Sequence, residues 1–369
     1  MPKIAALILA AGYSSRMGRF KPLLQLGHKT AIEWAVDAFS GAGIERLAVV
    51  TGHEAEALET ALAAAGIPAV RNPDYAQGMY TSVRAGIAAL DADVDACFLL
   101  PVDIPLVRPS TVAALAARYA ELPMPVIHPT FRGRRGHPPL LGCQVFAAIL
   151  AGDGDGGLRA VLEEWPAADV AVADEAILLV MDTPDDHVRL AELAAHRHLP
   201  TAAECEAILD MAGVAEPVRR HARAVAAVAR ALAAPLHDLE LPLVTAGGLL
   251  HDIAKGQPAH AEAGAERLEA LGYPQVAAVI RRHMDLDFTA DAGLDETAVV
   301  FLADKLVRED RRVALESRFR PAFERFANQP EALAGARRKY DSARQVLEAI
   351  EGRAGRHCAD MLRDCGVPA

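Results

Sequence analysis

The sequence changes character near residues 185–200, and this change constrains the fold more than any other feature. Before it, short apolar runs such as Ile4–Leu9 and Ala96–Leu100 alternate with helical stretches such as Ala31–Ala42. Apolar strands separated by helices are typical of a mostly parallel sheet covered on both faces. After it, the strand pattern ends and Ala-, Leu- and Val-rich stretches follow helical spacing. We therefore expect an α/β domain over residues 1–190 and an all-α domain over residues 200–369.

Individual elements of the first part can be predicted from apolar runs and from the turn residues between them. The predicted helices are Ala31–Ala42, Glu54–Ala65, Thr81–Leu90 and Pro109–Glu121. The predicted strands are Ile4–Leu9, Leu47–Val50, Ala69–Val70, Ala96–Leu100, Val126–Ile127, Pro139–Leu141 and Ile177–Met181.

Charge and cysteine content restrict the function classes. The 369 residues include 38 Lys and Arg against 49 Asp and Glu, which gives a net charge of −11. A general binder of nucleic acid or of an anionic membrane would show a basic surface instead. The five cysteines are scattered without CxxC spacing, and no apolar run reaches the ~20 residues of a membrane span. We expect a cytoplasmic protein with no nucleic-acid or membrane partner.

The segment from Leu9 to Leu24 predicts a phosphate-binding loop. It follows the first predicted strand and contains Ala10, Ala11, Gly12 and Ser14. Small residues let the backbone approach a ligand closely, so that its N–H groups can point at phosphate oxygens. Arg16 and Lys21 add two positive charges beside the loop, as a triphosphate requires.

Two carboxylates follow predicted strands of the same sheet. Asp103 comes after Ala96–Leu100, and Asp182 comes after Ile177–Met181. Ligands of open α/β sheets lie beyond the carboxyl ends of the strands, and Mg²⁺ prefers one or two carboxylates plus substrate oxygens. Each Asp taken alone is also compatible with a helix cap or a turn. Taken together, they predict a Mg²⁺ site.

Six motifs in order across residues 1–190 resemble those of the molybdenum cofactor cytidylyltransferase branch of the MobA-like nucleotidyltransferases. The family's LAAGxSxRMGxxKxLL, GMxxSL, GDMP, GxRGHP, GDxGxR and DTPxD patterns correspond to the segments 9–24, 78–83, 102–105, 133–138, 154–159 and 182–185.

The resemblance implies a reaction and a set of roles. It implies Mg²⁺-dependent transfer of CMP from CTP to molybdenum cofactor, with release of pyrophosphate, and a molybdenum hydroxylase that receives the product. Ala11 implies CTP because the guanylyl branch has LAGG at this place. Asp103 and Asp182 are then the Mg²⁺ ligands, and Arg16 and Lys21 are catalytic. The implied nucleotide-binding residues are Leu9, Ala10, Ala11, Gly12, Ser14, Arg16 and Lys21, and the implied acceptor-binding residues are Gly78, Met79, Ser82, Arg135 and His137.

Two positions depart from this pattern. Val102 stands where the family has Gly, and Val180 stands where many members have a further Asp. A different acceptor, such as a phosphosugar or another pterin, is therefore a second hypothesis.

The second part of the chain predicts a metal centre on helices. His221, His283 and Asp304 each lie on the apolar side of a predicted helix, and His251-Asp252 form an adjacent pair. Burying a carboxylate without a partner would be costly, and a metal ion removes that cost. His260 lies on a further apolar stripe with Leu268.

These residues resemble the metal site of the HD-domain phosphohydrolases. Segments 246–255, 221–226 and 303–307 are similar to the family's AxLLHDxxK, HxxxVA and ADKLV patterns. The resemblance implies His221, His251, Asp252 and Asp304 as metal ligands, with His260 and His283 at a second metal, and one or two ions of Mn, Fe, Zn or Mg. It implies hydrolysis of a phosphate ester by His251, Asp252 and Lys255, although a helix-capping role for Lys255 and a purely sensory role for this domain remain alternatives.

Overall fold

The computed structural model describes residues 2–289 and 293–369, and the chain forms two compact units. The first unit runs to Arg197, and the second runs from His198 to Ala369. Each unit is built differently and is described by itself.

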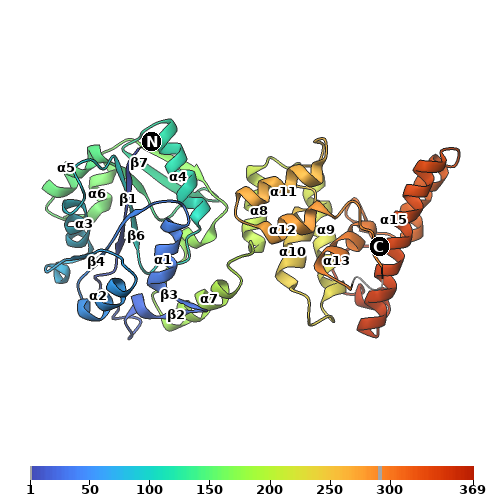
Figure 1. Cartoon of the computed structure of the whole chain (residues 1–369), viewed down its shortest axis with the longest axis horizontal. Helices are drawn as coiled ribbons and strands as arrows, with labels where there is room; N and C mark the ends of the chain where they lie inside the picture. Colours follow the sequence, from blue (N-terminus) through green and yellow to red (C-terminus); the bar gives the residue numbers. More distant parts are fainter. Residues whose placement is uncertain (1, 290–292) are drawn as a thin grey trace. The chain divides into compact units, whose positions relative to one another are not determined.

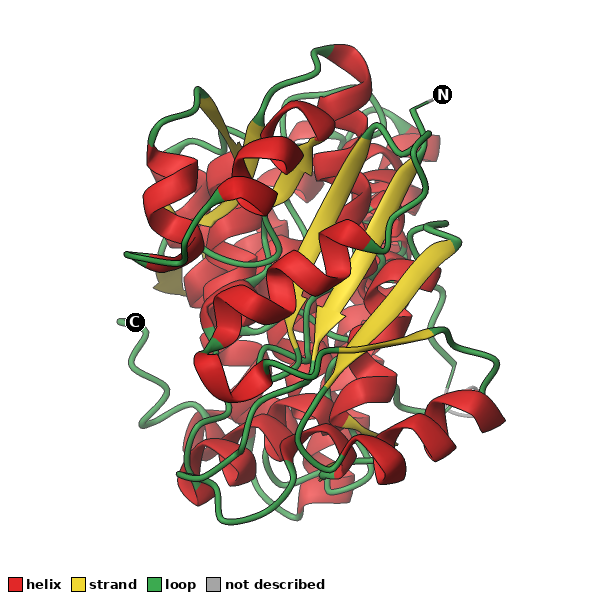
Figure 2. Ribbon diagram, turned by 90° about the vertical axis from the view of Figure 1, so that its left-hand side faces the viewer, coloured by secondary structure: helices red, strands yellow, loops and turns green. Residues whose placement is uncertain are grey.

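An eight-stranded sheet forms the centre of the described part of the first unit (Figure 2). Its strand order is β10-β7-β9-β6-β1-β4-β5, and β8 (Arg134–Arg135) pairs with β7. β9 (Leu140–Gly142) runs antiparallel to β6 and β7, whereas β1, β4, β5 and β6 are parallel neighbours. The predicted α/β fold with a mostly parallel sheet is confirmed. The other bounds are β1 (Ile4–Leu9), β4 (Arg46–Thr51), β5 (Ala69–Arg71), β6 (Ala96–Pro101), β7 (Val126–Phe131) and β10 (Ala167–Ala171).

Helices cover both faces of this sheet (Figure 1). α3 (Met79–Ala88), α5 (Phe146–Ala151) and α6 (Gly157–Glu163) lie on one face, and α1 (Ala31–Ser40) and α4 (Pro109–Glu121) lie on the other. Successive residues of a strand point to opposite faces. Leu7 and Leu9 of β1 accordingly pack with the α3 side, while Phe98 of β6 contacts Phe39 of α1. Further elements are α2 (Ala55–Ala64), α7 (Pro184–Ala195), β2 (Gln25–Leu26), β3 (Lys29–Thr30), and the 3-10 helices η1 (Lys21–Leu23), η2 (Tyr75–Gln77), η3 (Cys143–Val145) and η4 (Glu175–Leu178).

The predicted strand Ile177–Met181 is wrong. The 3-10 helix η4 occupies Glu175–Leu178. The N–H of Met181 donates to the carbonyl of Asp103 at 2.8 Å and the carbonyl of Ile177 accepts from the N–H of His137 at 3.0 Å, but these bonds form no strand ladder. Ile177 and Met181 are buried all the same, so the apolar run reflects a buried connection rather than a strand. The edge strand β10 was not predicted, because its residues are only partly buried and apolar periodicity is weak there.

The second unit is helical. α9 (Glu216–Ala233), α10 (Leu241–Leu250) and α13 (Glu296–Lys305) pack against one another, and every residue from Thr297 to Lys305 is buried. No described helix in the chain is long and apolar enough to cross a bilayer. The remaining elements are α8 (Ala202–Met211), α11 (His260–Ala270), α12 (Pro274–Arg281), α14 (Leu315–Arg325), α15 (Pro330–Ala354), α16 (Cys358–Met361), β11 (Val307–Arg308) and β12 (Arg311–Arg312).

A glycine brings α9 and α10 unusually close. A Cβ atom at Gly248 would lie 2.6 Å from the Cα atom of Ala226 on α9. Only a residue without a side chain tolerates such an approach. Because Gly248 lies three residues before His251, this contact helps to bring His251 next to His221, with their ring centroids 5.3 Å apart.

Candidate functional sites

The loop after β1 is held in place by backbone hydrogen bonds. The N–H of Ala10 donates to the carbonyl of Val50, and the N–H of His53 donates to the carbonyl of Ala11. Ser14 adopts a left-handed conformation (φ 54°), and its hydroxyl accepts a hydrogen bond from the N–H of Lys21 at 3.1 Å. The loop therefore folds back so that Lys21, at the start of η1, lies beside the end of β1.

Lys21 lies between the two predicted magnesium ligands. Its Nζ is 2.8 Å from Oδ1 of Asp182 and 3.5 Å from Oδ2 of Asp103. Nη1 of Arg16 lies 3.0 Å from Oδ2 of Asp182, although the Arg16 side chain is largely exposed. Asp182 directly precedes α7, whose first turn is fixed by a capping box between Thr183 and Asp186. The structure thus brings together all four residues that were expected to be catalytic in the first unit.

The electrostatic surroundings of Asp103 favour a bound cation. Burial raises the pKa of Asp103, the positive charge of Lys21 opposes this, and the charge of Asp182 adds to it. Burial also lowers the pKa of His137, which the charge of Asp103 partly offsets. Two neighbouring carboxylates that share one ammonium group offer the oxygen donors that Mg²⁺ prefers.

A cavity of about 300 Å³ opens beside these residues. Its lining includes most of the predicted nucleotide- and acceptor-binding residues. They are Leu9, Ala10, Ala11, Gly12, Ser14, Lys21, Gly78, Met79 and Ser82, and the predicted magnesium ligand Asp103 lines the cavity as well. Arg16 and Asp182 adjoin the cavity through the ion pairs with each other and with Lys21.

Two predicted acceptor residues stand apart from this lining. Arg135 lies on β8 at the sheet edge and pairs with Asp169 at 2.7 Å. His137 lies near enough to Asp103 to interact with its charge, and its N–H donates to the carbonyl of Ile177. The cavity lining therefore includes Gly78, Met79 and Ser82, but neither Arg135 nor His137.

An aromatic group at the mouth of this cavity was missed by sequence reasoning. Tyr13 is half exposed, and its ring centroid lies 5.0 Å from that of His53 and 5.4 Å from that of Tyr75. Tyr13 occupies a variable position of the loop motif, and Tyr75 lies in a short 3-10 helix, so neither carries a clear sequence signal. Such exposed rings offer a surface on which a planar ligand can stack.

The second site gathers side chains from five segments of the second unit. Nε2 of His221 lies 3.1 Å from Oδ1 of Asp304, at the end of α13, and 3.9 Å from Oδ2 of Asp252. Nε2 of His251 lies 3.4 Å from Oδ2 of Asp252. On the other side of Asp252, Oδ1 lies 3.4 Å from Nε2 of His260 and 3.9 Å from Nε2 of His283. All six predicted metal-site residues of this unit are therefore brought together.

Three of these imidazoles are fixed through their second nitrogen. Nδ1 of His221, His251 and His283 lies within hydrogen-bond distance of the carbonyls of Glu309, Gly248 and Ile280, respectively. Nε2 of His251, His260 and His283 is buried and has no hydrogen-bond partner among the residues that the structure describes. A backbone carbonyl that holds one ring nitrogen while the other points at carboxylates is the usual arrangement of a metal-binding histidine.

These residues form two possible metal-binding groups. One comprises His221, His251 and Asp252, and the other comprises Asp252, His260 and His283. Asp252 belongs to both, so its two oxygens can serve two ions. The donor set of nitrogen and oxygen atoms suits Mn²⁺, Fe²⁺ or Zn²⁺ as well as Mg²⁺.

The pKa values of Asp252, Asp304 and His283 are shifted by burial and by the charges of their neighbours. Burial alone would raise the pKa of Asp252, but His251 and Lys255 outweigh it and hold that pKa well below its usual range. The same competition, with Lys305 as the main partner, keeps the pKa of Asp304 low. Burial and the nearby His251 lower the pKa of His283 to about 4. Anionic carboxylates beside a neutral imidazole are the ionisation states that a metal ion requires.

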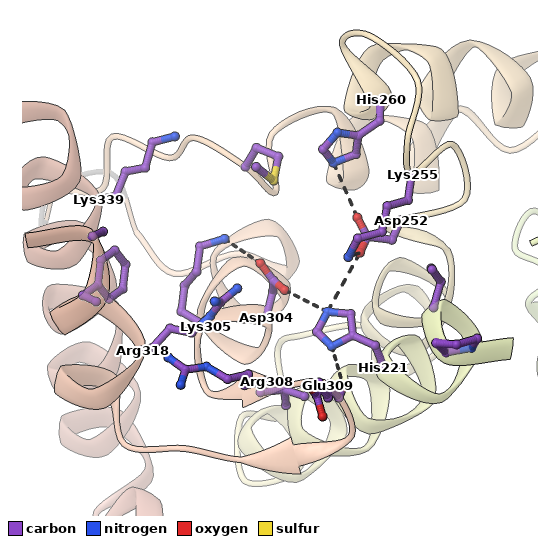
Figure 3. Close-up of a pocket in the computed structure, with 16 residues that line it drawn as sticks. His221, Asp252, Lys255, His260, Asp304, Lys305, Arg308, Glu309, Arg318 and Lys339 are labelled. Carbon is purple, nitrogen blue, oxygen red and sulfur yellow. Dashed lines mark hydrogen bonds and ion pairs between the residues drawn. The ribbon is translucent and has the colours of Figure 1, made fainter. Parts of the chain in front are cut away.

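Lys255 and four basic residues that were not predicted as site residues, Lys305, Arg308, Arg318 and Lys339, line a larger cavity of about 550 Å³ (Figure 3). Nζ of Lys255 lies 2.6 Å from Oδ2 of Asp252, and Nζ of Lys305 lies 2.6 Å from Oδ2 of Asp304. Arg318, which the sequence did not single out, also points into this cavity. Lys305 could have been predicted because it directly follows Asp304 in the segment 303–307. Arg318 could not, because it lies on a helix of mixed charge that contains no motif.

Two family models match the chain. The model described as "MobA-like NTP transferase domain" matches residues 6–172, and the model described as "HD domain" matches residues 218–309. The two matches fall in different units.

Known proteins resemble the first half of the chain. The molybdenum cofactor cytidylyltransferase of Escherichia coli (strain K12) is 30% identical over 194 residues, which are 52% of this chain and 97% of that protein. The nicotine blue oxidoreductase of Paenarthrobacter nicotinovorans is 28% identical over 52% of this chain and 97% of that protein. Among solved structures, a nucleotidyl transferase from Methanothermobacter thermautotroptrophicus is 26% identical, covers 52% of this chain and 98% of its own, and has a TM-score of 0.46.

Proposed function

Because the chain belongs to the MobA-like NTP transferase family and carries an HD domain after the transferase domain, we propose that it is a bifunctional enzyme. Residues 1–190 would transfer CMP from CTP to molybdenum cofactor, and residues 200–369 would hydrolyse a phosphate ester with the help of metal ions. The first activity supplies a molybdenum hydroxylase with its cofactor.

The observation that carries the transferase proposal is the position of Lys21 between Asp103 and Asp182. Nucleotidyl transfer depends mainly on positioning and on charge neutralisation. Lys21 and Arg16 hold the triphosphate, and the N–H groups of the loop around Gly12 approach its oxygens. The terminal phosphate of the acceptor attacks the α-phosphorus, and pyrophosphate leaves. Mg²⁺, when held by the two carboxylates, supplies the remaining positive charge.

In this proposal, the acceptor occupies a different part of the cavity from the triphosphate. Gly78, Met79 and Ser82 line it, and Asn72 fixes Ser82 through a hydrogen bond of 2.9 Å between its amide and the hydroxyl. His137, which lies close enough to Asp103 to interact with its charge, would contact the acceptor there. The aromatic rings of Tyr13 and Tyr75 suit a planar ring system such as a pterin.

A second candidate is transfer to a different acceptor. Val102 lines the cavity next to Asp103, where the family pattern has Gly. A relative with a different function, the nicotine blue oxidoreductase, is almost as similar as the cytidylyltransferase. A phosphosugar or another pterin as acceptor fits the same transfer chemistry.

The observation that carries the hydrolase proposal is the shared carboxylate Asp252, which belongs to two groups of imidazoles that could hold metal ions. These ligands hold metal ions, and Lys255 and Lys305 neutralise charge on the phosphate beside them. Bound divalent ions would favour the attack of water on phosphorus. A domain that binds metal and nucleotide only to regulate the transferase would show the same ligands without turnover.

The test of the transferase is pyrophosphate release by the full chain from CTP or GTP with Mg²⁺, with and without purified molybdenum cofactor. We expect release that requires both CTP and the cofactor. Release with CTP and another acceptor would support the second candidate, and no release with any acceptor would contradict both. Hydrolysis of p-nitrophenyl phosphate and of bis(p-nitrophenyl) phosphate by the same protein, with Mn²⁺ and with EDTA, tests the second activity.

A further inference from the structure

The carbonyl that orients His221 belongs to a short hairpin that is far from His221 in sequence. Nδ1 of His221 lies 2.8 Å from the carbonyl oxygen of Glu309, in the turn between β11 and β12 (Figure 3). A carbonyl can only accept, so Nδ1 carries the hydrogen and Nε2 is left for the metal site. For His251 and His283, the carbonyl lies only three residues earlier in the chain. Among these three histidines, His221 is therefore the one whose orientation depends on a distant segment.

The turn that provides this carbonyl needs support from outside the hairpin. The φ angle of Glu309 is 56°, which is in the left-handed region, and residues other than glycine adopt it only where their surroundings hold them there. Each strand of the hairpin is two residues long, and an isolated two-stranded hairpin is at best marginally stable. The ion pair between Asp310 of the turn and Arg220 of α9 is exposed and contributes little.

The segment 362–368, which we call the clasp, provides contacts that hold β12. The backbone N–H of Arg312 donates to the carbonyl of Pro368 at 2.7 Å, and Nη1 of Arg312 donates to the carbonyl of Leu362 at 2.6 Å. Nε of the same side chain is buried. Leu362 and Val367 are buried as well, so the clasp is itself anchored by apolar packing. Arg312 therefore joins the hairpin to an anchored segment through both its backbone and its side chain.

The clasp and Arg312 lie outside the part of the chain that matches the HD domain. That match ends at residue 309, within the turn itself. The helix just before the clasp, α16, packs against α9, which carries His221. The support for the His221 carbonyl thus comes from residues that this chain has in addition to the matched domain.

We propose that Arg312 and the clasp are positioning residues that hold His221, through the hairpin turn, in the orientation that binds a metal ion. This inference rests on the proposed metal site of the HD domain, and it makes one half of that site dependent on a segment outside the domain. A carbonyl that fixes a histidine ligand typically accounts for ten- to hundredfold in metal affinity. The group of Asp252, His260 and His283 does not include His221 and should not depend on the clasp.

The test is binding of Co²⁺ to the full chain, followed by its d–d absorption, in two backgrounds that separate the groups. His283→Ala leaves the group that contains His221, and His221→Ala leaves the other group. Adding Arg312→Ala is expected to raise the dissociation constant for Co²⁺ about tenfold in the first background and to leave it unchanged in the second. Arg312→Lys, which keeps one side-chain donor, should restore most of the affinity.

The matched control is Arg311→Ala. Arg311 is exposed and lies on the same strand, so its removal should change the Co²⁺ affinity in neither background. A chain shortened to Gly366 lacks the carbonyl of Pro368 and replaces Arg312→Ala if that variant does not fold. We expect it to weaken Co²⁺ binding in the His283→Ala background alone.

A second measurement needs no metal ion. Nuclear magnetic resonance of the metal-free chain with isotope-labelled histidine follows the exchange of the Nδ1 hydrogen of His221 with water, and His221→Ala assigns its signal. The hydrogen bond to Glu309 should make this exchange slow in the parent. Arg312→Ala should make it faster, whereas the Nδ1 hydrogen of His251, which is bonded to Gly248, should exchange as before.

The possible outcomes separate this inference from the proposed hydrolase. Equal Co²⁺ affinity in Arg312→Ala and Arg311→Ala, with unchanged exchange at His221, would overturn the positioning role while the metal site stands. Equal weakening in both backgrounds would overturn it too, because it would mean a general loosening of the unit. A parent chain that binds no Co²⁺ and hydrolyses no phosphate ester would overturn the proposed hydrolase, and the exchange of the His221 hydrogen would still show whether Arg312 holds the turn.

Discussion

The two sites of this chain handle charge in opposite ways. In the first unit, Arg16 and Lys21 face Asp103 and Asp182, so cations and carboxylates balance before a ligand arrives. In the second unit, imidazoles and two carboxylates form a buried centre surrounded by an excess of Lys and Arg. The first arrangement offers only oxygen donors for a metal ion, and the second offers nitrogen and oxygen donors.

This difference follows from the elements that build each site. Loops at the carboxyl ends of β1 and β6 form the first site, where the carboxylates of Asp103 and Asp182 stay partly exposed. Helices α9, α10 and α13 bury the second site, and burial without charge compensation would be too costly for its carboxylates. The comparison predicts that each site can be disabled without the other.

The largest effect is expected for Asp252→Asn. Asp252 belongs to both metal groups, and the amide keeps the shape but removes the charge that two ions would share. Metal content of the second unit, measured by plasma mass spectrometry, should fall close to zero, and phosphate-ester hydrolysis should be lost with it. Nucleotidyl transfer should persist, and the exposed control Asp287→Asn should change neither property. Loss of transfer in a folded Asp252→Asn protein would contradict the independence of the two sites.

The reciprocal change is Asp103→Asn. It removes a negative charge beside Lys21, and the loss of several kcal/mol of charge stabilisation corresponds to about a thousandfold in rate. Pyrophosphate release should decrease by that factor, while metal content of the second unit stays the same. Asp185→Asn, three residues beyond Asp182 and exposed, is the control. Equal pyrophosphate release from the variant and the parent would exclude Asp103 as a metal ligand.

Packing offers a test of how each unit positions its site. Gly248→Ala places a methyl group against the backbone of Ala226, and overpacking of this kind costs about 1–3 kcal/mol. Gly86→Ala on α3 meets the ends of the Leu7 and Val50 side chains rather than backbone atoms, so its cost should be smaller. Urea unfolding measures the free energy of unfolding of both variants.

The exposed Gly352→Ala on α15 is the control for these two substitutions. A Cβ atom there has no neighbour within 4 Å, and the substitution should be stabilising by up to about 1 kcal/mol. A Gly248→Ala protein as stable as the parent would show that α9 and α10 can separate freely.

The smallest effect is expected for Ala11→Gly. Ala11 is buried, and a Cβ atom at Gly52 would lie 2.8 Å from its methyl group, so the methyl sets the spacing between the loop and the end of β4. Its removal should lower the preference for CTP over GTP about tenfold, measured as the ratio of the two kcat/KM values. Ala10→Gly is the control at a neighbouring buried position, and an equal change there would mean that Ala11 has no special role.

Much of the fold was predictable from local pattern. The strand at Ile4–Leu9 and the helix at Pro109–Glu121 have the predicted bounds, because a continuous apolar run and a proline start are strong local signals. Ile177–Met181 was mistaken for a strand, since a short apolar run does not distinguish a buried 3-10 turn from a buried strand. The apolar composition of this segment therefore reflects its burial in the tertiary structure and does not indicate its secondary structure.

Only the site residues that belong to sequence motifs could be predicted. Motif positions such as Lys21 and Asp252 do lie at cavities, but their roles stay predictions. Tyr75 and Arg318 had no motif, since they reach their cavities from elements whose placement depends on tertiary packing. Arg135 matched the family pattern in sequence, yet its side chain pairs with Asp169 outside the cavity lining.

A buried ion pair between Arg197 and Asp174 lies at the end of the first unit, and a stable fragment of this unit has to include it. Arg197, its last residue, is buried, pairs with Asp174 and donates from Nε to the carbonyl of Leu106. Asp174 also accepts hydrogen bonds from the N–H of Arg108 and the hydroxyl of Thr111. Removing one partner of a buried pair costs about 3–5 kcal/mol, a large share of the 5–15 kcal/mol that holds a typical protein folded. A transferase fragment ending at Ala195 should therefore be degraded or aggregate, whereas proteolysis just after Arg197 should release a soluble one.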